Sequence, residues 1–237
     1  MELHKTVTTF ERPQGIIKRI KCWAEGEDVA DPTDDNCYLV EQDGRHVLID
    51  TCRSLYRDLV FEELDRTGVD AVALTHGHFD HCQNTAAVVA RYGAKVAMSA
   101  RDIPLMAAQT LQPFKADTDM GRAFKEIAWA ELVKQTVEPF DVDLCYHDWM
   151  PLTEIGLDGV VFATPGHTKG HVGIDLWDSD VFVGDILMNP TGTPVRALLF
   201  FDGSLIDESV HRILTLEGER TIHFGHGDEV QKSHLFL

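Results

Sequence analysis

Short runs of apolar and β-branched residues, separated by turn-forming residues, mark the N-terminal part of the chain as rich in strands. The runs 36–41 (NCYLVE) and 46–50 (HVLID) lie on either side of Asp43-Gly44. Asp-Gly between two such runs predicts a β-hairpin. The mixed apolar and basic run 16–23 predicts a further strand before this hairpin.

An alternation of strand and helix patterns follows the predicted hairpin. Leucines at helical spacing predict a helix over 55–67, and the short apolar run 71–74 predicts a buried strand. The segment 84–92 predicts a second helix that ends at Gly93, and 95–99 predicts another strand. The His-rich segment between the run 71–74 and the second helix therefore lies on a loop from a strand to a helix.

Residues 101–150 differ from the rest of the chain, because they are rich in large apolar side chains on predicted helices, most clearly over 123–137. No linker rich in Pro, Gly or Ser divides the chain. We therefore expect one domain, 1–237, with a helical insertion at about 101–150. After the insertion the pattern predicts strands at 160–163, 173–177, 181–184 and 221–224 and a helix at 208–216.

The strongest chemical signal is the segment 75–84 (THGHFDHCQN). It holds His76, His78, Asp80 and His81, whose imidazole and carboxylate groups are ligands of zinc and similar divalent metals. Alternate residues of an extended segment point the same way, so His76 and His78 can share one ion. Asp80 and His81 follow the bend toward the helix and can face a second ion. A solvated His-rich loop is the alternative, but this density of ligands at the mouth of a strand favours a metal site.

Three further residues of ligand type stand beside glycine after predicted strands. His167 lies in TPGHTKGH, Asp185 in FVGDIL and His226 in IHFGHGDE. Glycine beside such a residue lets a loop approach an ion closely. Because four residues cannot complete two metal sites, we expect these three to supply the remaining ligands.

The order of these elements resembles the metallo-β-lactamase superfamily. The resemblance rests on the HxHxDH run at 76–81, the TPGHT, GD and GHG elements around the later ligands, and the upstream run YLVEQDGRHVLIDT. It implies an α/β fold, an αββα sandwich of two mixed β-sheets that pack together and carry helices on their outer faces. It also places the metal loops along one edge of the sandwich.

The resemblance further implies a site with two divalent ions, zinc by default, with iron or manganese as alternatives. The implied ligands are His76, His78 and His167 for one ion, Asp80, His81 and His226 for the other, and Asp185 for both. A hydroxide bridging the ions would attack the carbonyl of an ester, thioester or lactone, and Asp80 would orient it and pass on its proton. A bridging aspartate resembles the glyoxalase II, lactonase and ribonuclease Z branches, whereas the antibiotic-degrading branch commonly has cysteine there.

Two other functions stay open. A mononuclear iron dioxygenase of persulfide type shares the implied fold and would leave His81 and His226 free. A metal-stabilised binding or sensor protein would not be an enzyme. The full ligand set favours two ions and hydrolysis of a small-molecule substrate.

Candidates for substrate contact rest on weaker signals. His171 could touch substrate or orient a ligand, although its pattern favours a surface or capped histidine. Phe114, Phe124 and Trp129 could line an apolar pocket as part of a lid, or could pack the insertion onto the domain or into a homodimer contact. Asp50, at the end of a predicted strand, could hydrogen-bond a metal ligand or form a turn.

Charge and cysteine content narrow the expected partners and compartment. The net charge of -18 argues against nucleic acid and anionic membrane surfaces as partners. The 5 cysteines form no CxxC pair, which favours a reducing compartment. No signal-peptide pattern or run of membrane-spanning length is present in the sequence, so we expect a cytoplasmic protein.

Overall fold

Two mixed β-sheets form the inner layers of the protein. The computed structural model describes residues 1–26, 33–107, 114–132 and 134–235, with the backbone alone for 107 and 127–132. The strands of the first sheet, in spatial order, are β1 (Glu2–Arg12), β2 (Gly15–Glu25), β3 (Asp35–Gln42), β4 (Arg45–Ile49), β5 (Ala71–Ala73), β6 (Lys95–Met98) and β7 (Leu144–Cys145). Strands β1 to β4 are antiparallel, and β4 to β7 are parallel.

The second sheet comes from the C-terminal part of the chain and pairs β11 with β14 in parallel and its other strands antiparallel. In spatial order its strands are β15 (Val230–Gln231), β14 (Thr221–His223), β11 (Asp180–Phe182), β10 (Val172–Leu176), β9 (Gly159–Ala163) and β8 (Met150–Pro151). A separate pair joins β12 (Leu187–Met188) to β13 (Val195–Arg196).

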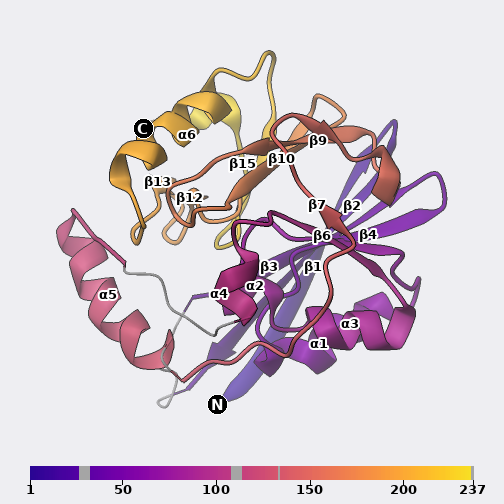
Figure 1. Cartoon of the computed structure of the whole chain (residues 1–237), viewed down its shortest axis with the longest axis horizontal. Coiled ribbons are helices and arrows are strands. Elements are labelled where there is room, and N and C mark those ends of the chain that lie inside the picture. Colours follow the sequence, from indigo (N-terminus) through magenta and orange to yellow (C-terminus); the bar gives the residue numbers. More distant parts are fainter. Residues whose placement is uncertain (27–32, 108–113, 133, 236–237) are drawn as a thin grey trace.

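Helices cover the outer faces of both sheets. The α-helices are α1 (Arg57–Leu64), α2 (Phe79–Cys82), α3 (Thr85–Tyr92), α4 (Ile103–Ala107), α5 (Asp119–Leu132) and α6 (Gly203–Leu214), and the 3-10 helices are η1 (Ser54–Tyr56), η2 (Thr153–Ile155) and η3 (Lys232–His234). Figure 1 shows α1 and α3 outside the first sheet and α6 outside the second. This is the αββα sandwich that the sequence predicted. In the parts of the chain described above, no helix is both long and apolar enough to cross a membrane.

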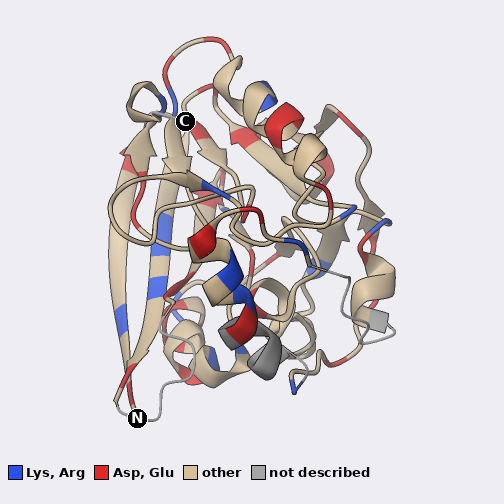
Figure 2. Cartoon of the chain, turned by 90° about the vertical axis from the view of Figure 1, so that its left-hand side faces the viewer, with Lys and Arg blue, Asp and Glu red and all other residues tan. Residues whose placement is uncertain are grey.

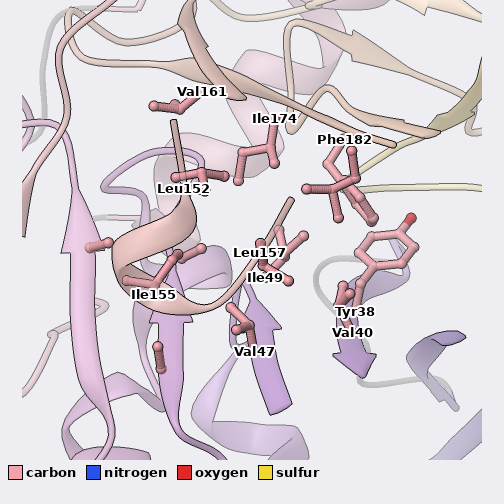
Figure 3. Packing of buried hydrophobic residues seen from close by; sticks show 14 of the residues in the cluster. Tyr38, Val40, Val47, Ile49, Leu152, Ile155, Leu157, Val161, Ile174 and Phe182 are labelled. Carbon is pink, nitrogen blue, oxygen red and sulfur yellow. The ribbon is translucent and has the colours of Figure 1, made fainter. Parts of the chain in front are cut away.

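The central core fills the space between the two sheets. Tyr38, Val47 and Ile49 of the first sheet face Ile174 and Phe182 of the second (Figure 3). Side chains of a strand alternate between its two faces, so the neighbouring positions of β3 and β4 point the other way and pack beneath α1 and α3. A third cluster lies between the second sheet and α6. Continuous burial of β3 follows from this layering, because both of its faces are covered.

Several local predictions are confirmed. The Asp43-Gly44 hairpin joins β3 to β4 with the expected pairing of Gln42 and Arg45. Helix α3 ends at Gly93, whose φ of 68° is the left-handed conformation that glycine adopts without a steric penalty. The helix predicted over 55–67 is shorter than expected, because the last turn before Gly68 is not α-helical.

The region 101–150 is only partly helical. Helices occupy parts of 103–132, whereas the remainder is extended and contributes β7 to the first sheet and β8 to the second. Phe140 and Tyr146 pack against the first sheet's core, and Met150 is buried between the sheets. The apolar residues after 134 therefore belong to the sandwich and not to an insertion.

Two other elements differ from the sequence prediction. Strand β1 was not predicted, because its threonines and charged residues obscure the alternation of apolar and polar positions that marks a strand. The strand is half-exposed and pairs along its whole length with β2. Helix α6 begins at Gly203 rather than 208, because the Asp202 side chain accepts a hydrogen bond from the Ser204 N–H at 3.1 Å and caps the helix.

Basic residues of the long β1–β2 hairpin tie it to the loop after β14. Lys and Arg are visible along this hairpin in Figure 2. Arg19 lies 2.9 Å from Asp228, and Lys21 lies 3.1 Å from Asp228 and 2.7 Å from Asp34. These ion pairs hold together two loops that border the candidate metal centre.

A buried carboxylate, Asp180, links β1 to the second sheet. It accepts hydrogen bonds from Arg12 at 2.7 and 2.8 Å and from His223 Nε2 at 2.8 Å. Asp180→Asn is expected to lower the free energy of unfolding by about 3 kcal/mol at pH 7, because it removes the charge from a buried network. Urea unfolding measures this loss, and Asp43→Asn, in an exposed turn, is the matched control.

The same carboxylate makes stability depend on pH. Burial opposes ionisation of Asp180, but hydrogen bonds from His223 and Arg12 prevail and lower its pKa to about 2, compared with about 3.9 in an unfolded chain. Its contribution is complete above the unfolded pKa and is lost as pH falls toward the folded one. The stability gap between wild type and Asp180→Asn should therefore narrow from about pH 4 to about pH 2. A gap of constant size would show that the network does not depend on this charge.

Candidate metal centre

The loop between β5 and α2 carries the His-rich segment to the edge of the first sheet. His78 is extended (φ -77°, ψ 150°), and α2 begins directly after it at Phe79. His76 and His78 thus precede the bend, whereas Asp80 and His81 lie in the single turn of α2. The bend separates the four side chains into two pairs, as the spacing predicted.

Loops from both sheets complete two groups of metal-ligand type. Within each group, the ligand atoms lie within 4.8 Å of one another. The first group is His76, His78 and His167, and the second is Asp80, His81, Asp185 and His226. Every member is buried except Asp80, which is partly exposed. The three later residues follow β9, β11 and β14, so their sheet delivers them to the same edge as the His-rich loop.

The carboxylate of Asp185 lies between the two groups. Its Oδ1 is 3.2 Å from His81 Nε2, and its Oδ2 is 3.4 Å from His226 Nε2. The same Oδ2 is 3.6 Å from His167 Nε2 of the first group. Asp185 is thus a carboxylate whose oxygens lie near ring nitrogens of histidines in both groups, which is the geometry of a bridging ligand.

Several donor atoms that converge here have no hydrogen-bond partner outside the two groups in the described structure. His76 Nε2, His81 Nε2 and Asp185 Oδ1 are buried and have no hydrogen-bond partner among the described residues. A buried polar atom without a partner costs about 1–3 kcal/mol, so several at one point indicate a missing ligand. His78 Nδ1 also faces His167 Nε2 at 2.8 Å. Nitrogen and carboxylate donors in this arrangement fit divalent transition metals.

The outer ring nitrogens of the histidines are held by oxygen atoms. Such contacts fix the tautomer and orientation of a ligand histidine and leave its other nitrogen for a metal. The Nδ1 partners are Thr75 Oγ1 for His76, Asp50 for His81, the Leu199 carbonyl for His167 and the Asp34 carbonyl for His226. The residues present therefore fit a metal centre in both chemistry and orientation.

Comparison with known proteins agrees with this geometry. The profile of the metallo-beta-lactamase superfamily matches residues 30–226. The chain belongs to the metallo-β-lactamase superfamily. The matched residues include all members of the two ligand groups, and they extend across both sheets.

Curated relatives within this superfamily are distant. The chain is 27% identical over 205 residues to the "Beta-lactamase-like protein 2 homolog" of Drosophila melanogaster, covering 83% of this chain and 60% of the relative. It is 28% identical over 197 residues to a "Hydroxyacylglutathione hydrolase" of Xanthomonas campestris pv. campestris, covering 79% of this chain and 58% of the relative. The chain thus spans about three-fifths of the length of these relatives.

Solved structures share the metallo-β-lactamase fold with this chain. TTHA1623, crystallised in a di-iron-bound form, has a TM-score of 0.62 and 27% identity, covering 86% of this chain and 92% of its own. The BLEG-1 B3 metallo-beta-lactamase has a TM-score of 0.65 and 23% identity with the same coverage, which shows a common fold alone.

Asp50 holds the loop that carries the candidate ligands through several hydrogen bonds. It accepts hydrogen bonds from the Thr75 N–H at 2.8 Å, from Thr75 Oγ1 at 2.7 Å and from His81 Nδ1 at 2.8 Å. Because the Thr75 hydroxyl donates to Asp50, it can accept from His76 Nδ1. One carboxylate therefore orients a histidine of each group, and the predicted hydrogen bond between Asp50 and a candidate ligand is confirmed.

The two groups differ in their protonation. Burial lowers the pKa of His76 well below its usual range and lowers the pKa of His78 to about 3. Burial opposes protonation of His81 and His226 too, but the surrounding carboxylates, Asp185 foremost among them, together outweigh it and raise the pKa of both well above the usual value. The first group is therefore neutral and ready to bind, whereas ions that bind the second must displace protons.

His171 does not lie at the surface, which was one of the two favoured predictions, but has both ring nitrogens capped by hydrogen bonds. Its side chain is buried at 1% exposure. Nε2 accepts the Asp185 N–H at 3.1 Å, so Nδ1 carries the proton and donates to Thr164 Oγ1 at 2.8 Å. Both nitrogens are used within the protein, and they leave none for a substrate. His171 positions the backbone of Asp185.

The three aromatic candidates of the insertion differ in their relation to the centre. The Phe114 ring is buried and lies 5.2 Å from His78 and 6.3 Å from His167, between ring centroids. Phe124 is half-buried on α5, and no ring contact joins it to the metal-site histidines in the described parts of the chain. The Trp129 side chain lies outside the described residues. Phe114 is thus the candidate that lies over the first group.

Asp102 is a site residue that the sequence reasoning missed. Its buried carboxylate accepts hydrogen bonds from the Gly77 N–H at 3.1 Å, from Thr168 Oγ1 and from the Gly170 N–H at 2.7 Å. It therefore joins the loop of His76 and His78 to the loop of His167. Its place just after a predicted strand, at the edge where the ligands gather, was the available signal.

Proposed function

We propose that this protein is a dinuclear metal-dependent hydrolase that cleaves an ester, thioester or lactone bond in a small molecule. The observation that carries the proposal is the position of Asp185, which lies within 3.6 Å of His167 in one group and of His81 and His226 in the other. A mononuclear centre needs only one of these groups. The superfamily and the hydroxyacylglutathione hydrolase relative support the reaction class.

The proposed hydrolytic chemistry follows from the metal ions that the two ligand groups would hold. Divalent ions held there would lower the pKa of water toward neutrality and polarise a carbonyl oxygen. Zinc is the proposed metal because imidazole and carboxylate ligands suit it, and iron or manganese would suit the same donors. Asp50, His171 and Asp102 hold the ligand loops rigid, so the donor atoms need little rearrangement during the reaction.

Asp80 is the proposed catalytic carboxylate. It is the partly exposed member of the seven, and its Oδ2 lies 3.4 Å from His226 Nε2. His81 and His226 outweigh the effect of burial and hold the pKa of Asp80 below its usual value, so it is ionised at neutral pH. An ionised carboxylate open to substrate can orient a water molecule and accept its proton.

A substrate screen tests the proposed function. The chain, loaded separately with zinc, iron and manganese, is assayed against generic esters, thioesters, lactones and phosphodiesters. Hydrolysis of a carboxylic substrate, lost in Asp80→Asn and retained in Asp43→Asn, is the expected result. Oxygen consumption with persulfide substrates, or no turnover with any metal, would contradict it.

Phe114 is expected to control how substrate binds. Phe114→Ala should change KM or substrate preference by about tenfold with full metal content, because it removes the apolar wall beside His78. Phe124→Ala, on the same insertion, should leave both kinetic constants near wild type. Steady-state kinetics and metal analysis of the two variants make the comparison. Unchanged kinetics in Phe114→Ala, with altered assembly state, would favour packing or a dimer contact over a lid.

A further inference from the structure

A cavity lies behind the metal centre, where the ends of β6, β7 and β9 meet the loop between β9 and β10. Its volume is about 410 Å³, which falls within the roughly 300–1,000 Å³ of small-molecule sites. The cavity is lined by Ser99, Arg101, Tyr146, His147, Asp148, Ala163, Pro165, Lys169, Gly170, His171 and Val172. The position is a cleft between the two sheets at their open side.

This rear cleft is separate from the metal centre but adjoins it. None of the seven candidate ligands is among its lining residues. His171 forms the wall between them, with its ring centroid 5.0 Å from that of His76 and 6.0 Å from that of His167. An occupant of the rear cleft would therefore not be the reacting molecule, yet it would contact the residue that positions Asp185.

Two cations without ion-pair partners among the described residues lie together at the rear cleft. Arg101 and Lys169 are exposed, and neither has a carboxylate within ion-pair distance in the described parts of the chain, although acidic residues outnumber basic ones 39 to 21. The carboxylate beside them, Asp148, is already paired with Arg212 at 2.8 Å. Asp102, behind the cleft wall, is engaged by the donors of its two loops. The cleft thus presents two cations without counter-charges.

Tyr146 also lines the rear cleft. Its hydroxyl is buried and has no hydrogen-bond partner among the described residues, so it is not open to an occupant of the cleft. The groups that the cleft presents without counter-charges are therefore the side chains of Arg101 and Lys169, and an anion complements them.

We propose that the rear cleft is a binding site for a small anion that carries a phosphate, sulfate or carboxylate group, held by Arg101 and Lys169. The bound anion would lie against His171 and apart from the ligand groups. This assignment does not depend on which bond the metal centre cleaves.

Calorimetric titration of the metal-loaded full chain with sodium sulfate, and separately with sodium succinate, at constant ionic strength, tests the proposal. We expect saturable binding of one anion per chain at the rear cleft. The double substitution Arg101→Ala and Lys169→Ala should weaken it by at least about tenfold, because it removes both charged donors of the cleft. The tighter probe identifies the head group as tetrahedral oxyanion or carboxylate.

The matched control is Lys95→Ala, which removes another exposed basic side chain without an ion pair in the described structure, at the far end of β6. It should leave the anion affinity at the wild-type value. Equal affinity in wild type and the double variant would overturn the proposal, because the anion would then bind elsewhere, including at the metals. Absence of binding by both probes would overturn it as well.

Discussion

Asp185→Asn is expected to lower turnover by at least about 100-fold and to reduce the affinity for at least one metal ion. Loss of a residue that merely orients a ligand already costs about 10–100-fold, and Asp185 touches both ligand groups directly. Asparagine keeps the shape but removes the negative charge that two cations would share. Metal content and kcat, measured on the same preparations, give the two effects together.

Asp43→Asn is the control for this prediction, since it makes the same chemical change in an exposed turn. It should retain the metal content and turnover of the wild type. The backbone hydrogen bond between the Asp185 N–H and His171 does not involve the side chain, so Asp185→Asn should keep its fold. Wild-type turnover and metal content in this variant would mean that Asp185 does not bridge.

Removing the metals is expected to lower the free energy of unfolding by about 4 kcal/mol, the value for a ligand present at 1,000 times its dissociation constant. The physical reason is the burial of the donor atoms of His76, His81 and Asp185, which have no hydrogen-bond partner among the described residues outside the two ligand groups and which bound ions would satisfy. Urea unfolding in excess zinc and in excess chelator measures the difference. Identical midpoints in the two conditions would show that the folded chain does not bind zinc.

The elements around the metal centre could be predicted from sequence because their signals are local. The β3–β4 hairpin follows from Asp-Gly between two apolar runs, and the end of α3 follows from Gly93. The ligand loop follows from the spacing of His76 to His81. Each of these features depends on residues within a few positions of one another, and the family resemblance supplied their order.

Other features depend on contacts between distant segments and could not be predicted in this way. Strand β1 is stabilised by pairing with β2 and by the Arg12–Asp180 contact, which spans 168 positions. The sequence of the apolar run before Met150 is equally compatible with a helix. In the structure this part of the chain forms β7 and leads into β8, which pair with the two sheets. Asp102 has no motif of its own, because its partners come from two loops distant in sequence.

Counting the metal ions tests the dinuclear centre most directly. The full chain is dialysed to equilibrium against excess zinc, passed through a desalting column and submitted to elemental and protein analysis. Asp185→Asn and the wild type are treated side by side. The two ligand groups joined by Asp185 predict two ions per wild-type chain and fewer in the variant. At most one ion per wild-type chain after saturation would contradict the dinuclear assignment and the hydrolytic function built on it.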